Sequence, residues 1–223
     1  MKKNFNNETK REFLEAWRTF GPSGNPEAVF SLLTACYTEE GREYHDTRHV
    51  SHCFHEFWHY NDTPFTGKNL SARKAAIVRL FAAFHDAVYD PHRTDSEERS
   101  ARLAEGLLQL SGADESVVRE VAELVRFTKY AAVPKTEMEK LVSDLDLCIF
   151  GTEQESFDWY ENGIRKEYGF VPEAEFRAKR AKILQGFLDR PNIYFTKYFR
   201  DKYEAKAREN LKRSVAKLTS QVK

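Results

Sequence analysis

Two ionisable side chains, His85 and Asp86, interrupt an otherwise apolar stretch of the sequence. Between Leu80 and Tyr89 they are the only ionisable groups apart from the phenol of Tyr89. If this stretch is helical, it is apolar on every face and is expected to be buried. A carboxylate in such surroundings is costly unless it is paired or coordinates a metal. Two interpretations are open: a metal-binding pair in a core, or a His-Asp dipeptide at a helix end whose carboxylate is hydrogen-bonded to a neighbouring element.

A second carboxylate, Asp146, also lies among apolar residues. Val142 precedes it by four positions and Ile149 follows it by three, so its neighbours on a helix face are apolar. The nearby Asp144 has Lys140 four residues before it and is expected to form an ordinary surface ion pair. Asp146 therefore repeats the anomaly seen at Asp86.

Several histidines lie at or within a helix predicted from about Arg48 to Tyr60. His49 is at the edge of the apolar stripe of this helix, and His45 lies just before the helix or in its first turn. A histidine at such a boundary is more often a satisfied residue at the edge of a core than a metal ligand. The residues expected to form the stripe are Val50, Cys53, Phe54, Phe57 and Trp58, while His52, His55 and His59 fall on the opposite, solvated side.

These acids and histidines, carried by three predicted helices, could form a single site. Two imidazoles, two carboxylates and water make a mixed nitrogen and oxygen shell of the kind that holds Mn, Fe, Co, Ni or Zn. Such a site depends on a fold that brings the three helices together.

Helix signals dominate the chain, and no convincing alternating strand is found. Helices are predicted at about residues 7–20, 25–41 and 48–60, from 71 through the apolar stretch, and at 172–189 and 197–218. The longest predicted loop covers residues 61–70, and we do not interpret it as a domain linker. We predict one all-α domain over residues 1–223, a bundle of about eight to ten helices. Capping boxes precede three further helices, at Thr94, Thr136 and Thr152.

The composition limits the classes of partner. Lys plus Arg and Asp plus Glu are both 35, so the net charge is zero. A neutral chain without charged tails is not expected to bind a nucleic acid polymer, although a small phosphorylated substrate is not excluded. No apolar run is long enough for a membrane span, and the N-terminal residues lack the apolar segment of a signal peptide. Cys36, Cys53 and Cys148 are interpreted as reduced core residues, so we expect a cytoplasmic protein.

The order His49, then His85-Asp86, then Asp146 resembles the HD superfamily of metal-dependent phosphohydrolases. Within that superfamily, the likeness is to an uncharacterised group described as predicted metal-dependent HD phosphohydrolases. It extends from about Arg42 to near the C-terminus. The segments that carry it are Arg42-x-Tyr44-His45-x-x-x-His49, Phe84-His85-Asp86-Ala87-Val88-Tyr89-Asp90-Pro91, Asp144-x-Asp146-Leu147-x-Ile149-x-Gly151, Ile164-Arg165-x-Glu167-Tyr168 and Ala207-Arg208-x-Asn210-Leu211.

The resemblance implies one divalent transition metal, Mn, Fe, Co, Ni or Zn, in a core at about residues 42–151. Helices at 152–220 would pack on this core. The activity implied is hydrolysis of a nucleotide or another small phosphate ester or anhydride by a metal-activated water. The ligands implied are His49, His85, Asp86 and Asp146.

Two further residues take possible roles from relatives within the superfamily. His45 matches a histidine that protonates the leaving oxygen in cyclic-nucleotide phosphodiesterases, and an imidazole pKa of about 6.5 suits that step. Asp90 matches an acid that helps to activate water in (p)ppGpp hydrolases, but an Asp-Pro turn explains it equally well. Arg42, Arg48 and Lys129 are possible phosphate partners or ordinary surface charges. Asp95, Glu97 and Glu98 could approach substrate or a second metal, or simply favour the start of a helix.

The chain departs from the group at one position that limits its chemistry. Many members of the group carry a histidine shortly after the threonine that matches Thr128. No histidine occurs in Thr128-Lys129-Tyr130-Ala131-Ala132, and none follows His92. A second tightly held metal and a redox function are therefore disfavoured. A regulatory HD module that binds a ligand without turnover stays open as an alternative, and we expect a monomer or a homodimer.

Overall fold

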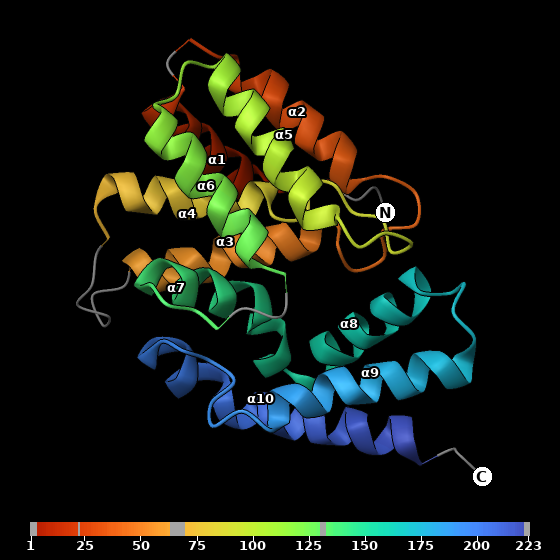
Figure 1. The fold of residues 1–223 in the computed structure, drawn as a ribbon. Coiled ribbons are helices and arrows are strands. Elements are labelled where there is room, and N and C mark those ends of the chain that lie inside the picture. The colour runs from red at the N-terminus through yellow and green to blue at the C-terminus, as the bar shows by residue number, and fades with distance from the viewer. Residues whose placement is uncertain (1–3, 22, 63–69, 130–132, 221–223) are drawn as a thin grey trace. The chain divides into compact units, whose positions relative to one another are not determined.

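The computed structural model describes residues 4–21, 23–62, 70–129 and 133–220. Within these residues the chain forms ten α-helices and one short 3-10 helix, with no strand (Figure 1). The prediction of an all-α fold with eight to ten helices is confirmed. None of the described helices is both long and apolar enough to cross a membrane. The elements are α1 (Asn7–Phe20), α2 (Pro26–Tyr37), α3 (Thr47–Asp62), α4 (Ala72–Phe84), α5 (Ser96–Leu110), α6 (Glu115–Phe127), α7 (Glu137–Asp146), η1 (Leu147–Gly151), α8 (Gln154–Glu167), α9 (Glu173–Leu188) and α10 (Lys197–Thr219).

The chain divides into two compact units, Met1–Leu145 and Asp146–Lys223. The division falls one residue before the end of α7, so nearly all of this helix belongs to the first unit. The proposed single domain stays a prediction. The predicted loop at 61–70 falls largely on residues 63–69, which lie outside the described residues.

Helix α4 is the centre of the first unit. The side chain of its N-cap, Ser71, accepts a hydrogen bond from the backbone of Lys74, as expected for the start of a helix. Helices α1, α3, α5 and α6 all pack against α4 (Figure 1). Burial of so many apolar side chains is the main stabilising contribution of this helix. The buried residues of α4 are Ala75, Ala76, Ile77, Val78, Leu80, Phe81, Ala82, Ala83 and Phe84.

Helix α4 ends at Phe84, earlier than the apolar run suggests, and His85 is its C-cap. The backbone beyond it is held by side chains distant in sequence. The amide of Asp86 donates to the hydroxyl of Tyr37 at 3.3 Å, and Ser100 Oγ accepts from the amide of Val88 at 2.9 Å. These side chains accept hydrogen bonds from backbone amides that would otherwise require further helical turns. The helix can therefore end at Phe84 without leaving those amides unpaired. The expectation of a buried helix around the His-Asp pair is therefore wrong beyond Phe84.

The buried face of α3 differs at one edge from the predicted stripe. Val50, Cys53, Phe54 and Phe57 are buried, but Trp58 is 39% exposed. The reason is that the buried face also includes polar or amphipathic residues, which hydrophobicity alone does not select. The buried face therefore does not extend to Trp58. The additional buried residues are His49, Glu56 and Tyr60.

Only one of the three predicted capping boxes forms. Thr136 Oγ1 accepts from the amide of Glu139 at 3.1 Å, and the Glu139 carboxylate accepts from the amide of Thr136 at 3.1 Å. Helices α5 and α8 instead begin after Asp95 and Glu153, whose side chains make no cap hydrogen bond. The Thr152 hydroxyl donates back to the carbonyl of Ile149 at 2.8 Å, and Thr152 lies one residue before the N-cap of α8.

The second unit contains η1, α8, α9 and α10. Helices α9 and α10 pack side by side, and η1 packs on α10 (Figure 1). Asn210 of α10 donates to the carbonyls of Phe150 and Thr152, both at 2.9 Å. A Cβ at Gly151 would collide with Tyr203, so glycine permits this close approach. The Asn210 and Gly151 of the sequence motifs therefore have a structural role here.

Candidate metal centre

The four predicted ligands are brought together. His49, His85, Asp86 and Asp146 each offer one ligand atom, and these atoms all lie within 4.8 Å of one another. His49 comes from the first turn of α3, and His85 and Asp86 directly follow α4. Asp146 is the last residue of α7. Three segments separated in sequence thus contribute to a single cluster.

The distances within the cluster suit a metal shell. His49 Nε2 lies 2.9 Å from His85 Nε2 and 3.5 Å from Asp86 Oδ2, and His85 Nε2 lies 3.1 Å from that same oxygen. Donor atoms about 2.0–2.2 Å from one ion, at angles between octahedral and tetrahedral, are about 2.8–3.6 Å apart. All three measured distances fall in this range, so the residues present fit a divalent metal.

Both imidazoles are oriented by a partner on their other nitrogen. His85 Nδ1 lies 3.0 Å from the carbonyl of Ala82, which can only accept, so this nitrogen carries the proton. In the neutral ring, His85 Nε2 then presents a lone pair. Tyr44 Oη lies 2.9 Å from His49 Nδ1 and fixes the second ring. Outer partners of this kind hold metal-binding histidines in place and set their tautomers.

The carboxyl of Asp86 is strongly influenced by these rings. Burial raises the pKa of Asp86, but the charge of His85 and a hydrogen bond from it lower the pKa by more. His45 and His49 contribute smaller lowering effects, and the net result is a pKa well below its usual range. While His85 is protonated, it therefore holds Asp86 as a carboxylate, the form that binds a metal, and a bound metal would replace the Nε2 proton of His85.

Searches against protein-family models, curated proteins and solved structures find no match to this chain.

The contact between Tyr44 and His49 gives a first prediction. We expect Tyr44→Phe to weaken metal affinity about 10–100-fold, the usual effect of losing an outer partner of a ligand. The ring of Tyr44 is buried and remains in the variant, so little core packing is lost. Titration of the metal-free protein with Co²⁺, followed by visible absorption, measures this change. Unchanged affinity would show that Tyr44 does not orient His49.

Arg42 joins the segment before α3 to the segment after α4. Its side chain is buried, and its guanidinium donates to the carbonyls of His45 at 2.9 Å, Asp86 at 2.7 Å and Ala87 at 2.9 Å. This contradicts the view of Arg42 as an ordinary surface charge. Its donors are directed at the backbone that carries His45 and Asp86, so Arg42 positions the site.

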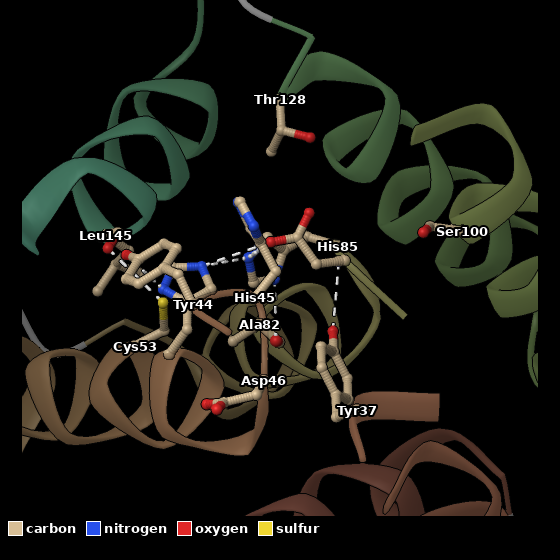
Figure 2. Close-up of polar contacts among 12 residues, drawn as sticks. Tyr37, Tyr44, His45, Asp46, Cys53, Ala82, His85, Ser100, Thr128 and Leu145 are labelled. Carbon is tan, nitrogen blue, oxygen red and sulfur yellow. Dashed lines mark hydrogen bonds and ion pairs between the residues drawn. The ribbon is translucent and has the colours of Figure 1, made fainter. Parts of the chain in front are cut away.

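His45 lies beside the cluster but outside the ligand set. Its ring is partly exposed and stacks on the ring of Tyr89, with centroids 4.2 Å apart. The centroid of the His49 ring is 6.0 Å away. In Figure 2, His45 points toward the cluster, whereas the neighbouring Asp46 points away from it.

Asp90 is held in a turn. Asp90 Oδ1 accepts from the amide of His92 at 2.9 Å, a contact typical of a turn-forming aspartate. This contact supports the Asp-Pro turn interpretation of Asp90. A role in orienting water stays a prediction.

Several other candidates have partners outside the cluster. Asp95 pairs with Arg93 at 2.7 Å, and Glu98 pairs with Arg126 at 2.6 Å, which lowers the pKa of Glu98 to about 2. Such contacts are typical of a surface ion-pair network. Glu97 is partly exposed at the start of α5, where an acid favours the helix. The two remaining cations are also engaged, Arg48 with Asp46 at 2.6 Å and Lys129 with the carbonyl of Thr94 at 3.1 Å.

Two residues, on α3 and α7, have surroundings that the sequence did not predict. Cys53, one turn after His49, offers a sulfur within 4.8 Å of ligand atoms of His49 and His85. Because residues four apart lie on the same face of a helix, the spacing of Cys53 from His49 could have placed the two side chains together from the sequence alone. Asp144 is fully buried, so its assignment to a surface pair is wrong. Lys140 pairs instead with Glu137 at 2.6 Å.

Proposed function

We propose that this chain is a metal-dependent phosphohydrolase of the HD type, acting on a nucleotide or another small phosphate ester or anhydride. The convergence of His49, His85, Asp86 and Asp146 carries the proposal. The four residues occur in the chain order that the HD superfamily resemblance implies. Buried imidazoles beside a carboxylate of lowered pKa are characteristic of functional sites.

The metal proposed for this cluster is a single divalent ion of Mn, Fe, Co, Ni or Zn. When bound, it would polarise a phosphoryl oxygen and lower the pKa of water at the site. His49 and His85 supply nitrogen donors whose rings are fixed in advance by Tyr44 and the Ala82 carbonyl. Asp86 and Asp146 supply negative charge that offsets the charge of a divalent ion.

His45 is proposed to hold a proton for the leaving oxygen of the substrate. Its ring is near enough to the ligands to reach a phosphate held there, and Tyr89 limits the orientations available to it. Arg42 holds the peptide carbonyl of His45 at 2.9 Å, so the backbone of this residue is also fixed. A positioned proton donor of this kind requires no movement of the chain before the reaction.

We propose a cytoplasmic protein, a monomer or a homodimer, with no nucleic acid polymer or membrane as its partner. The equal numbers of acidic and basic residues support the absence of a polyanion partner.

The proposed function is tested by metal analysis together with a substrate panel. We expect the purified protein to keep about one equivalent of a transition metal through dialysis. We also expect it to release phosphate from at least one nucleoside mono-, di- or triphosphate, or from a small phosphate ester. Removal of the metal should abolish this release, and adding the metal back should restore it.

Two outcomes would count against this function. Two equivalents of metal that survive dialysis would contradict the single-metal site. Metal-loaded protein that binds members of the panel but hydrolyses none of them would favour a regulatory module instead.

A further inference from the structure

The exposed side of α3 carries a second pair of converging imidazoles. His55 and His59 are one helical turn apart, and their Nε2 atoms are 3.1 Å from each other. Their ring centroids are 4.5 Å apart, and the rings are nearly perpendicular, at 83°. His55 is exposed and His59 is partly exposed, so both can be reached from solvent. The sequence predicted the solvated location but not the convergence.

We propose that His55 and His59 form a second, weaker site for a divalent ion such as Zn²⁺, Ni²⁺ or Cu²⁺. Two imidazole nitrogens bound to one such ion at about 2.0–2.1 Å are about 2.8–3.4 Å apart, for octahedral to tetrahedral angles. The observed separation lies in the middle of this range. Imidazole is a ligand that suits these metals, and water would complete the shell. This site does not depend on the proposed phosphohydrolase function.

The helical spacing of His55 and His59 places both rings on one face of α3. Residues four apart lie on the same face of a helix, which is why two histidines at this spacing bind zinc in metalloproteases. A hydrogen bond between the two rings also accounts for the separation when no metal is bound. Because the two Nε2 atoms already lie close together, a metal would take the place of the proton shared between them, which would move to Nδ1 of its own ring. Little further ordering of the side chains is needed.

The pair also belongs to a sequence pattern, His55-Glu56-Phe57-Trp58-His59, with the spacing of the zinc protease motif HExxH. In that motif the glutamate acts as a general base beside the metal. Here the Glu56 side chain is only 5% exposed, and its carboxylate lies 3.8 Å from His52 Nε2. The base is therefore buried while the histidine pair faces solvent. The geometry supports metal binding by the pair and does not support peptide hydrolysis.

The test is a calorimetric titration of full-length protein whose tightly held metal has been retained through dialysis. Zn²⁺ and Ni²⁺ are used as probes. We expect the wild type to bind one further equivalent that dialysis removes. His55→Gln and His59→Gln should each lose this equivalent and keep the tightly held metal.

His52→Gln is the matched control, because His52 is on the same helix and is 25% exposed. It should bind the further equivalent with unchanged affinity. Substitutions at such positions usually change stability little, and thermal melting of each variant checks this. Wild-type affinity in either His55→Gln or His59→Gln, or loss of binding in His52→Gln, would overturn the assignment.

Discussion

Asp86→Ala and Asp146→Ala are each expected to lose the tightly held metal entirely. Each substitution removes one of two carboxylates from a four-residue cluster whose ligand atoms lie within 4.8 Å. The remaining imidazoles would then face an ion without sufficient compensating charge. Metal content after dialysis measures the loss directly. Added metal should raise the melting temperature of the wild type, because an ion that binds only the folded protein stabilises it, by about 2.7 kcal/mol at one hundred times Kd.

The variants should show no such increase in melting temperature. Asp86→Asn and Asp146→Asn provide versions of nearly unchanged size, in case either alanine variant folds poorly. Asp90→Ala is the matched control, since Asp90 follows the same helix but its carboxylate accepts from the amide of His92. It should keep its metal. Full metal occupancy in either Asp86→Ala or Asp146→Ala would mean that the ligand set is wrong.

Local signals in the sequence located most of the helices. Helix starts were predicted at Asn25 with Pro26, at Ser71 and at Thr136. The side chains of Asn25, Ser71 and Thr136 each accept the expected hydrogen bond from a backbone amide of the first turn. These signals involve residues only a few positions apart, so the sequence alone contains the whole interaction. Thr94 and Thr152 have the same spacing but do not form capping boxes. Spacing therefore permits a cap, and the surrounding structure decides whether it forms.

The end of α4 shows a different limit. The apolar run continues past Phe84, so its composition gives no reason for the helix to stop. The side chains that hold the backbone from Asp86 to Val88 are those of Arg42, Tyr37 and Ser100, none of them within ten residues of Asp86. A pattern read along the chain cannot contain such contacts. The same reasoning applies to Arg42, whose charge left a phosphate contact or a surface position open. Its two terminal guanidinium nitrogens donate instead to three carbonyls and to Glu39.

The candidate ligands were easier to predict than their environment. A carboxylate among apolar neighbours is unusual enough to stand out, and Asp86 and Asp146 both did so. The degree of burial was less predictable, because Asp146 is partly exposed while Asp144, two residues earlier, is fully buried. The position of a residue along a helix determines only the direction in which its side chain points. Whether that side chain is buried depends on which neighbouring helices pack there. Tyr44 was noticed as part of a motif, but its contact with His49 required the fold.

His45→Ala is expected to separate chemistry from metal binding. His45 lies outside the ligand cluster, and its backbone carbonyl is held by Arg42, so loss of the ring should leave the ligands in place. If His45 donates the proton to the leaving oxygen, kcat should fall about 10²–10⁴-fold on alkyl phosphates. Metal content should equal that of the wild type. His92→Ala is the matched control, because His92 is an exposed histidine outside the ligand cluster.

The choice of substrate makes this test specific to proton donation. A leaving group such as p-nitrophenolate is a weak base and departs without a proton, so the defect of His45→Ala should shrink markedly on p-nitrophenyl phosphate. A variant that merely disturbed the site would be impaired on both kinds of substrate to a similar extent. Loss of metal in His45→Ala would identify His45 as a ligand. An unchanged kcat on alkyl phosphates would instead leave His45 with only its structural role, the stacking contact with Tyr89.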